Sequence, residues 1–306
     1  MYDLIIIGSG PAGLTAGIYA ERAGLKALVI ERNFMSGGQI IDTYEVDNYP
    51  GLMGINGFDL AQKMREHADQ LGVEFKTAEV QSVEDLGETK KVKTPEETLL
   101  SKAVLFATGA HHRSLGIPGE AEYAGKGVSY CATCDGAFYK NKDVAVIGGG
   151  NVAIEDAIFL ARTCQKVYVV HRRDQLRAQK ALQDKLFEFD NVEMVWHHTP
   201  VEVVGKDGKT SGLLVHDKLT DAEKTIDVSG VFVAVGIVPN TKGYEQICAL
   251  DNNGYIVAGE DCRTSAPGFF AAGDVRTKEV RQVATAVGDG ANAVASVERY
   301  LNTQEW

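Results

Sequence analysis

The order of hydrophobic and polar positions near the N-terminus predicts a buried strand, a tight turn and a helix in immediate succession. The apolar run 4–7 has the β-branched content of a strand buried on both faces of a sheet. The glycine-rich segment 8–13 (GSGPAG) follows it, and residues 14–20 have the small and apolar side chains of a helix packed on that sheet. A further apolar run at 27–30 predicts a second strand. This order is typical of an α/β protein.

The same pattern starts again in the middle of the chain. The apolar run 144–147 leads into 148–153 (GGGNVA), then into a predicted helix at 154–162 and a strand at 167–170. The remaining predicted elements are a helix at 58–71, a charged hairpin within 74–98, late apolar strands that end at Gly109 and Gly236, an apolar strand at 268–274 and a final helix from Arg281. The chain therefore has two dinucleotide-binding patterns.

The first glycine-rich turn has every part of a nucleotide-binding fingerprint. Gly8, Gly10 and Gly13 form G-x-G-x-x-G between a strand and a helix, where backbone N–H groups can reach a pyrophosphate. Glu31 ends the next strand, where a carboxylate can bind the hydroxyls of an adenosine ribose. A turn without a ligand is the alternative, which the presence of all four parts disfavours. This turn is predicted to bind FAD or NAD.

The second turn differs at the ribose position. The strand 167–170 ends in His171, Arg172 and Arg173 rather than in an acid, and Arg177 follows. A carboxylate there would repel a 2′-phosphate, whereas guanidinium groups bind one through forked, charge-assisted hydrogen bonds. The second turn is therefore predicted to bind NADPH. The alternative interpretation is a solvated basic surface loop.

Composition excludes several classes of protein. The 306 residues suffice for two domains, and the net charge of −11 argues against a general nucleic-acid-binding protein. No apolar run approaches the roughly 20 residues that cross a bilayer, and the N-terminus lacks the basic segment of a signal peptide. Five cysteines, an odd number, do not suggest a secreted disulfide framework. We expect a cytosolic protein.

The strongest chemical signal is the pair Cys131 and Cys134, with Asp135 directly after it. A C-x-x-C pair can close a disulfide ring that accepts two electrons, but the same spacing supplies half of many zinc sites. Zinc needs a second pair, and the other cysteines stand singly, so redox chemistry is favoured. Because nicotinamide does not usually reduce a disulfide directly, we expect a flavin relay, which assigns FAD to the turn with Glu31.

These motifs resemble those of the low-molecular-weight thioredoxin reductases across the whole chain and in the same order. The matching segments are 8–13, 37–39 (GGQ), 131–135 (CATCD), 148–151, 171–173 with Arg177, 273–275 (GDV) and 281–282 (RQ). The CATCD segment just before the second turn is the most specific of them, because in other disulfide-reducing flavoproteins the redox pair lies in the FAD half.

The resemblance implies an α/β fold of two Rossmann-like three-layer dinucleotide-binding domains, the second inserted into the first. An FAD domain is expected over residues 1–113 and 243–306, and an NADPH domain carrying the C-x-x-C pair over residues 114–242. In the family the NADPH domain rotates between half-reactions, because one flavin face cannot meet both the cysteine pair and the nicotinamide. Hinges are expected near residues 113–117 and 241–245.

The resemblance also implies roles for individual residues. Cys134 would receive electrons from the flavin, Cys131 would attack the disulfide of thioredoxin, and Asp135 would serve as the acid or base. Expected FAD contacts are Gly8, Gly10, Pro11, Ala12, Gly13, Glu31, Arg32, Gly38, Gln39, Asn48, Ala107, Thr108, Gly109, Gly273, Asp274, Arg281, Gln282 and Val283. Expected NADPH contacts are Gly148, Gly150, Asn151, Val152, Ala153, His171, Arg172, Arg173, Arg177 and Gly236. A homodimer is expected, and no metal.

Departures from the family pattern leave alternatives open. Val152 stands where Ser or Thr is common, and Ile237 where histidine is frequent, so the preference for NADPH over NADH stays open. One rival is a flavoprotein of the same scaffold that serves another protein carrier, or that takes electrons from ferredoxin or a flavin. The other is a non-catalytic zinc or nucleotide-sensing module. Among the single cysteines, Cys164 and Cys248 are expected to be buried, and Cys262, near a turn, to be exposed.

Overall fold

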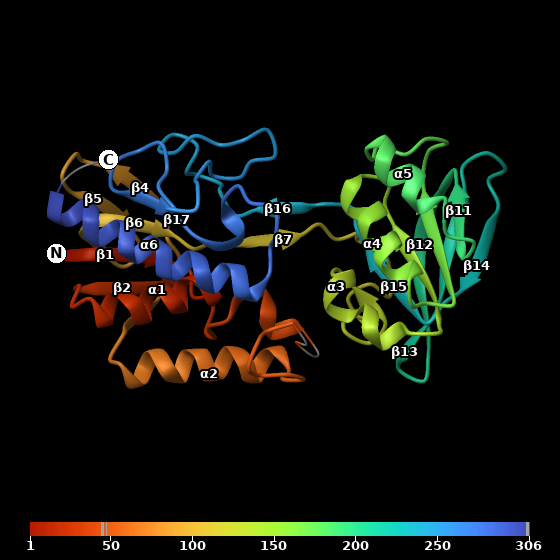
Figure 1. Ribbon diagram of the computed structural model, residues 1–306, viewed down its shortest axis with the longest axis horizontal. Helices are drawn as coiled ribbons and strands as arrows, with labels where there is room; N and C mark the ends of the chain where they lie inside the picture. The colour runs from red at the N-terminus through yellow and green to blue at the C-terminus, as the bar shows by residue number, and fades with distance from the viewer. Residues whose placement is uncertain (44–45, 47, 304–305) are drawn as a thin grey trace. The chain divides into compact units, whose positions relative to one another are not determined.

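A computed structural model describes residues 1–43, 46, 48–303 and 306 (Figure 1). Asp47, which precedes the expected FAD contact Asn48, lies outside the described residues. Over the described residues the chain divides into two compact units, Met1–His111 with Val238–Trp306 and His112–Ile237. The fold is of the α/β class, as the two glycine-rich patterns predict.

The first unit is built on a mainly parallel sheet with the strand order β3-β2-β1-β6-β5-β4, in which β17 also pairs with β6. β1, β2, β3, β6 and β17 are parallel neighbours, whereas β4 and β5 form an antiparallel hairpin on β6. The elements of this unit are β1 (Tyr2–Ile7), α1 (Pro11–Arg22), β2 (Ala27–Glu31), η1 (Gly38–Asp42), α2 (Gly57–Gln70), β3 (Glu74–Thr77), β4 (Ser82–Asp85), β5 (Lys90–Lys93), β6 (Thr98–Phe106), β17 (Phe269–Ala271), η3 (Gly273–Val275) and α6 (Val283–Thr303).

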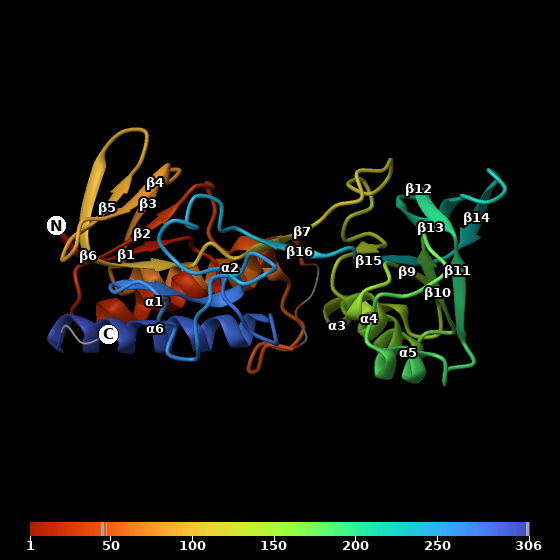
Figure 2. The same ribbon diagram turned by 90° about the horizontal axis from the view of Figure 1, so that it is seen from above.

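Both faces of this sheet are buried, which explains why its strands read as continuous apolar runs. Leu4 and Ile6 face a core that α1 and α6 close, and Figure 2 shows these two helices side by side under the sheet. Ile5 and Ile7 face the opposite core, which is closed by the β4–β5 hairpin and by residues between 244 and 275. The carboxyl ends of β1, β2 and β6 are thereby held at one edge.

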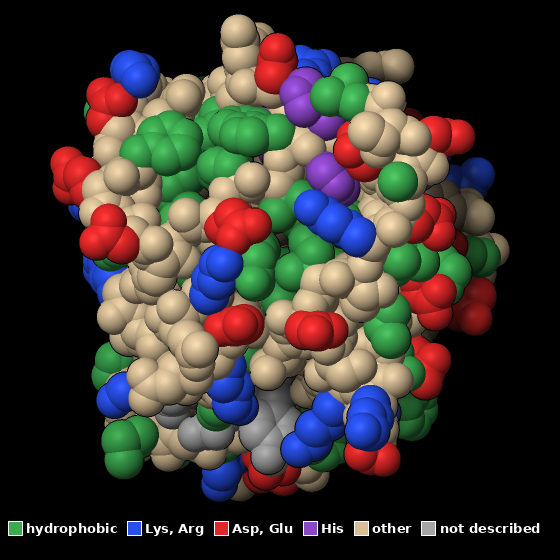
Figure 3. Space-filling view, turned by 90° about the vertical axis from the view of Figure 1, so that its right-hand side faces the viewer, with side chains coloured by type: hydrophobic (Ala, Val, Ile, Leu, Met, Phe, Trp, Pro, Cys, Tyr) green, Lys and Arg blue, Asp and Glu red, His purple; other side chains and the backbone are tan. Residues whose placement is uncertain are grey.

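The second unit repeats the parallel arrangement with the order β11-β10-β9-β15-β8. α4 and α5 cover one face, and the antiparallel sheet β12-β13-β14 packs on the other. Its elements are β8 (Val128–Ser129), α3 (Ala132–Asp135), η2 (Gly136–Tyr139), β9 (Asp143–Ile147), α4 (Asn151–Ala161), β10 (Lys166–His171), α5 (Lys180–Leu186), β11 (Val192–Trp196), β12 (His198–Lys206), β13 (Lys209–Asp217), β14 (Glu223–Asp227) and β15 (Gly230–Val233). Figure 3 shows one face of the molecule, on which acidic and basic side chains are interspersed.

The paired strands β7 (Ala110–His112) and β16 (Ile237–Pro239) contain the two boundaries between the units. Both stretches expected to act as hinges lie inside the units. Glu120 accepts hydrogen bonds from the backbone N–H groups of Leu115 (2.9 Å) and Gly116 (2.7 Å) within the second unit. Thr241 donates a hydrogen bond to the Gly254 carbonyl (2.8 Å) within the first.

Three details differ from the sequence-based expectations. The final helix begins at Val283 rather than at Arg281, and the late strand spans only Phe269–Ala271 before the chain turns into η3. Cys262 is fully buried rather than exposed, because the turn that carries it packs against the helical core, and its thiol donates a hydrogen bond to the Asp289 carbonyl (3.5 Å). Among the described residues, no helix is long and apolar enough to span a membrane.

Candidate functional site

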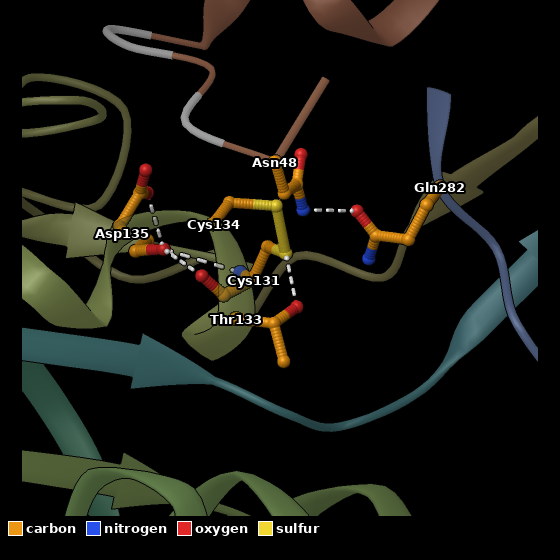
Figure 4. The surroundings of a disulfide bond; sticks show 7 residues. Asn48, Cys131, Thr133, Cys134, Asp135 and Gln282 are labelled. Carbon is orange, nitrogen blue, oxygen red and sulfur yellow. Dashed lines mark hydrogen bonds between the residues drawn. A yellow bond between two sulfur atoms is a disulfide. The ribbon is translucent and has the colours of Figure 1, made fainter. Parts of the chain in front are cut away.

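A disulfide joins Cys131 and Cys134 at the start of α3 in the second unit (Figure 4). Cys131 is the residue before the helix, and its Sγ lies 3.3 Å from the Thr133 hydroxyl. Ala132 is fully buried and fixes the turn to the same core as α4. The predicted pairing of the two cysteines is confirmed. Within the part of the chain that is described, no group of three His, Cys, Asp or Glu side chains is placed to hold a metal ion.

Asp135 lies in a desolvated position beside this ring. Burial raises the pKa of its carboxyl, and a hydrogen bond from the Ser129 hydroxyl (2.6 Å to Oδ2) partly offsets that rise. The other carboxylate oxygen, Oδ1, is buried without a hydrogen-bond partner among the described residues. A carboxyl with a raised pKa close to a disulfide is suited to hold and release a proton during thiol chemistry.

The two glycine-rich turns have the same construction. α1 and α4 each follow a glycine in extended conformation, Gly10 and Gly150, with no side chain capping the helix and no acidic residue in the first turn. Gly8 (φ 105°) and Gly148 (φ 154°) begin the turns with backbone angles that L side chains rarely adopt. Uncapped backbone N–H groups at a helix N-terminus are donors that suit a pyrophosphate.

The residues at the end of the second strand of each pattern turn back onto these turns. Glu31 Oε2 accepts hydrogen bonds from the backbone N–H (2.9 Å) and hydroxyl (2.8 Å) of Ser9. At the equivalent position, the His171 ring lies against Gly149, where an added Cβ would overlap it. Burial and the neighbouring arginines lower the pKa of His171, and its Nε2 lies 3.1 Å from the Gln175 carbonyl. Glu31 and His171 therefore brace the two turns as well as flanking them.

The arginines after His171 are exposed, in contrast to its buried ring. Arg172, Arg173 and Arg177 present their side chains to solvent, and the backbone N–H of Arg177 binds the Gly149 carbonyl (2.7 Å). That bond joins residues 172–177, called the arginine loop below, to the glycine-rich turn. A cavity of about 20 Å³ in the same unit is lined by His112, Tyr130, Val152, Val233, Ala234, Gly236 and Ile237. It brings the two departures from the family pattern, positions 152 and 237, together.

Four of the other expected FAD contacts, Asn48, Asp274, Arg281 and Gln282, lie in the first unit. Burial raises the pKa of Asp274, whose Oδ1 has no hydrogen-bond partner among the described residues. Asn48 donates a hydrogen bond to Gln282 (2.9 Å; Figure 4), and the Arg281 guanidinium lies over the Tyr255 ring at 3.9 Å. The Arg281 Nε is also buried without a described partner. These orphaned polar atoms are the kind that a bound polar ligand satisfies.

Comparisons with known proteins match this architecture over nearly the whole chain. Residues 2–290 match the family model described as pyridine nucleotide-disulphide oxidoreductase. The chain belongs to the pyridine nucleotide-disulphide oxidoreductase family. It is 47% identical to a thioredoxin reductase of Listeria monocytogenes (98% of this chain, 94% of the relative) and 43% identical to that of Bacillus subtilis (98% and 95%).

Solved structures of the family agree. The structure of thioredoxin reductase from Streptococcus pyogenes has a TM-score of 0.94 at 46% identity, covering 99% of each chain. That from Lactococcus lactis, in its FR conformation, has a TM-score of 0.68 at 42% identity with the same coverage. The predicted resemblance, fold class and enzyme class, a flavoprotein oxidoreductase, are thereby confirmed. Thioredoxin reductases of this family use FAD and NADPH, and the two uncapped glycine-rich turns and the orphaned Asp274 fit such groups.

Two groups of residues at this oxidoreductase site are absent from the sequence-based expectations. Ser129 bonds the Asp135 carboxyl, although a serine ahead of a C-x-x-C motif has no distinctive pattern. Asp289, on α6, accepts hydrogen bonds from the backbone N–H of Gly273 (2.8 Å), from Arg276 and from Lys278 (2.9 Å). The turn at Gly273 and Asp274 is therefore held by Asp289, which also forms buried ion pairs with Arg276 and Lys278. The sequence signal that could have pointed to Asp289 is the high content of glycine and small residues in α6, which is typical of a closely packed helix.

Proposed function

We propose that this chain is an NADPH-dependent thioredoxin reductase, with FAD bound by the first unit and NADPH by the second. The observation that carries the proposal is the Cys131–Cys134 disulfide, placed in the same compact unit as the glycine-rich turn with the arginine loop. Bound FAD and NADPH would supply a two-electron route from the coenzyme to that disulfide. The curated relatives named thioredoxin reductase support thioredoxin as the protein substrate.

The residues of the first unit suit FAD. The uncapped N-terminus of α1 would bind the pyrophosphate, and Glu31, with lone pairs left beyond its bonds to Ser9, would accept from the ribose hydroxyls. Asp274 would bind the ribityl or phosphate region through its unpaired oxygen. In the second unit, the uncapped N-terminus of α4 would bind the pyrophosphate of NADPH, and the exposed arginines its 2′-phosphate.

The thiol chemistry then follows from the pair itself. The reduced pair carries two electrons more than the disulfide, and Cys131 as thiolate attacks the substrate disulfide, forming a mixed disulfide as the substrate S–S bond breaks. The substrate thiolate released takes the proton held by Asp135. Cys134 as thiolate then attacks Cys131, re-forming the ring and expelling the second substrate sulfur, which takes a proton from solvent. Substrate disulfide becomes dithiol, and the pair returns to its oxidised state.

Rotation of the second unit between half-reactions is part of the proposal. The disulfide and the N-terminus of α4 are fixed to one core, so both cannot meet a single flavin face at once. The only described connections between the units run through β7 and β16, which suits movement about these strands. We also infer a homodimer that works in the cytoplasm, as expected for this family.

Anaerobic titration tests the proposal directly. NADPH should bleach the visible flavin absorbance, NADH should do so less readily, and electrons should pass to added thioredoxin. Cys134→Ser should keep flavin reduction by NADPH and lose thioredoxin reduction. Thr133→Ser, next to the pair but exposed, is the matched control and should reduce thioredoxin normally. A colourless purified protein, or a pair that stays oxidised under excess NADPH, would contradict the proposal.

A second candidate is reduction of another small redox protein on the same scaffold. One relative, 43% identical over 98% of this chain, is described only as a 34.2 kDa protein in the rubredoxin operon of Clostridium pasteurianum. Its description names an operon of a different electron carrier and no thioredoxin. Parallel assays with thioredoxin, a glutaredoxin-like carrier and rubredoxin would decide, and a kcat/KM at least tenfold higher for thioredoxin would support the first proposal.

A further inference from the structure

Ser129 contacts both ends of the segment 131–135, which contains the disulfide and Asp135 and is called the redox turn below. It is the last residue of β8, it is 4% exposed, and its side chain reaches across the disulfide-bearing segment. Its Oγ lies 2.6 Å from Asp135 Oδ2, 3.3 Å from the Cys131 carbonyl oxygen, and 3.1 Å from the Cys131 backbone nitrogen. One buried hydroxyl therefore contacts the acid that follows the ring and both backbone polar groups of Cys131, the residue at the start of the ring.

A hydroxyl has one proton to donate, so these contacts compete. The Cys131 N–H donates to Oγ, and the Ser129 proton can then go either to Asp135 or to the Cys131 carbonyl. While Asp135 is ionised, the short bond to its carboxylate is the stronger one. When Asp135 is protonated on Oδ2, the carboxyl donates to Oγ instead, and the hydroxyl proton is free to turn to the Cys131 carbonyl.

We propose that Ser129 is a positioning residue that holds the Asp135 carboxyl at the redox turn and moves its hydroxyl proton between Asp135 and the Cys131 carbonyl as Asp135 loses or gains a proton. The proposal rests on the proposed acid–base role of Asp135. It adds that the hydrogen bonding of the Cys131 peptide, and so the start of α3, changes with the protonation of that carboxyl.

Few other charges face Asp135 from the elements packed against it within its unit. Tyr139, on η2, interacts with the carboxyl and stays neutral, because burial and the nearby carboxylate raise its pKa to about 12. α4 packs against α3 and carries Glu155 and Asp156, whose charges act on each other. The strand beside β8, β15, carries no titratable side chain over Gly230–Val233. Burial is the larger influence on the protonation of Asp135, and the Ser129 hydrogen bond is the side-chain contact that acts against it.

Asp135 can be titrated by NMR in the oxidised protein, labelled with carbon-13 at the aspartate carboxyls and with its resonance assigned by its absence in Asp135→Asn. Because the Ser129 bond favours the carboxylate, Ser129→Ala should move the titration midpoint upward by about one pH unit. Ser129→Thr keeps the hydroxyl and should restore the wild-type midpoint. Ser101→Ala removes a fully buried hydroxyl without a described partner in the other unit and should change nothing.

The same variants give a functional readout. The pH profile of kcat for thioredoxin reduction should shift upward in Ser129→Ala together with the NMR midpoint, while KM for NADPH stays unchanged. An unchanged Asp135 midpoint in Ser129→Ala overturns the proposal, whatever the activity. Failure of the wild-type protein to reduce thioredoxin would instead overturn the proposed function, and the NMR titration would still report on Ser129.

Discussion

The imidazole ring of His171 lies against the backbone of Gly149, so that a methyl group at position 149 would overlap the ring. Position 149 is the second residue of its glycine-rich turn, as Ser9 is of the first, and Ser9 is held by two hydrogen bonds that it donates to Glu31. Both turns are therefore braced by the residue that ends the neighbouring strand. Protein contacts therefore hold the two turns in place, in addition to the nucleotide contacts proposed for them.

Gly149→Ala should destabilise the second unit, by about 1–3 kcal/mol of unfolding free energy, because the ring must leave its buried position. Urea unfolding followed by circular dichroism measures the unfolding free energy of the variant and of the wild type. Gly150→Ala is the matched control, because nothing lies within 4 Å of an added Cβ there and its backbone is extended. It should unfold like the wild type but bind NADPH more weakly, since its methyl group would project at the proposed pyrophosphate position. Equal stability of the two variants would contradict the bracing role.

The arginine loop should set the choice of coenzyme. Arg172→Gln and Arg173→Gln should each raise KM for NADPH by about 10- to 100-fold, the scale of one lost charge-assisted hydrogen bond pair, and leave KM for NADH nearly unchanged. Steady-state kinetics with both coenzymes measure this. Arg162→Gln, an exposed arginine at the other end of α4, should change neither. Parallel losses with NADPH and NADH would show that the loop does not read the 2′-phosphate.

Asp289 should stabilise the first unit in a pH-dependent way. Burial raises the pKa of this carboxyl, but hydrogen bonds from Arg276 and Lys278 outweigh it and hold the pKa below its ordinary value. Asp289→Asn leaves two buried cations without their carboxylate, which should cost about 3–5 kcal/mol at pH 7. Glu260→Gln removes an exposed carboxylate from the same arginine and should cost under about 1 kcal/mol.

The sign of the pH effect at Asp289 follows from its lowered pKa. Its contribution is present above the unfolded-state pKa of about 3.9 and is lost as the pH falls through the folded-state pKa. The difference in unfolding free energy between wild type and Asp289→Asn should therefore shrink on acidification below about pH 4. The FAD content of the purified variant should also fall, because Asp289 fixes Gly273. A difference that stays constant down to pH 3 would argue against the ion network.

The ionisation of Asp156 should change the stability of the fold with pH in the direction opposite to that of Asp289. Burial, and then the charge of Glu155, raise the pKa of its carboxyl to about 7. Such a group favours folding below its unfolded pKa and loses that contribution as the pH rises through its folded pKa. Asp156→Asn should therefore be more stable than wild type at pH 8, by roughly 1–3 kcal/mol, with a gap that closes towards pH 4. Thermal unfolding across this range measures the stability difference. Glu155→Gln removes only the second cause of the raised pKa and should give a smaller gain of the same sign. Stability curves of wild type and Asp156→Asn that run parallel across this range would contradict the prediction.

The features that can be predicted from sequence are those that depend on residues close together along the chain. The buried strands, the two glycine-rich turns and the Cys131–Cys134 pair each depend on neighbouring residues, so periodicity and spacing reveal them. Ser129, Asp289 and the buried ring of His171 act through contacts set by tertiary packing. Periodicity shows which side of an element is buried, but not which buried polar atoms meet. Cys262 was misplaced for this reason, since a turn is usually exposed.

The electron acceptor and the arginine loop share the single compact unit 112–237, which is joined to the rest of the chain only through β7 and β16 over the described residues. By the proposed assignment of sites, exchanging that segment between relatives would transfer coenzyme choice and thiol reactivity together, through two junctions in β7 and β16. The unit proposed to bind FAD, residues 1–111 and 238–306, would keep its own sequence in such an exchange.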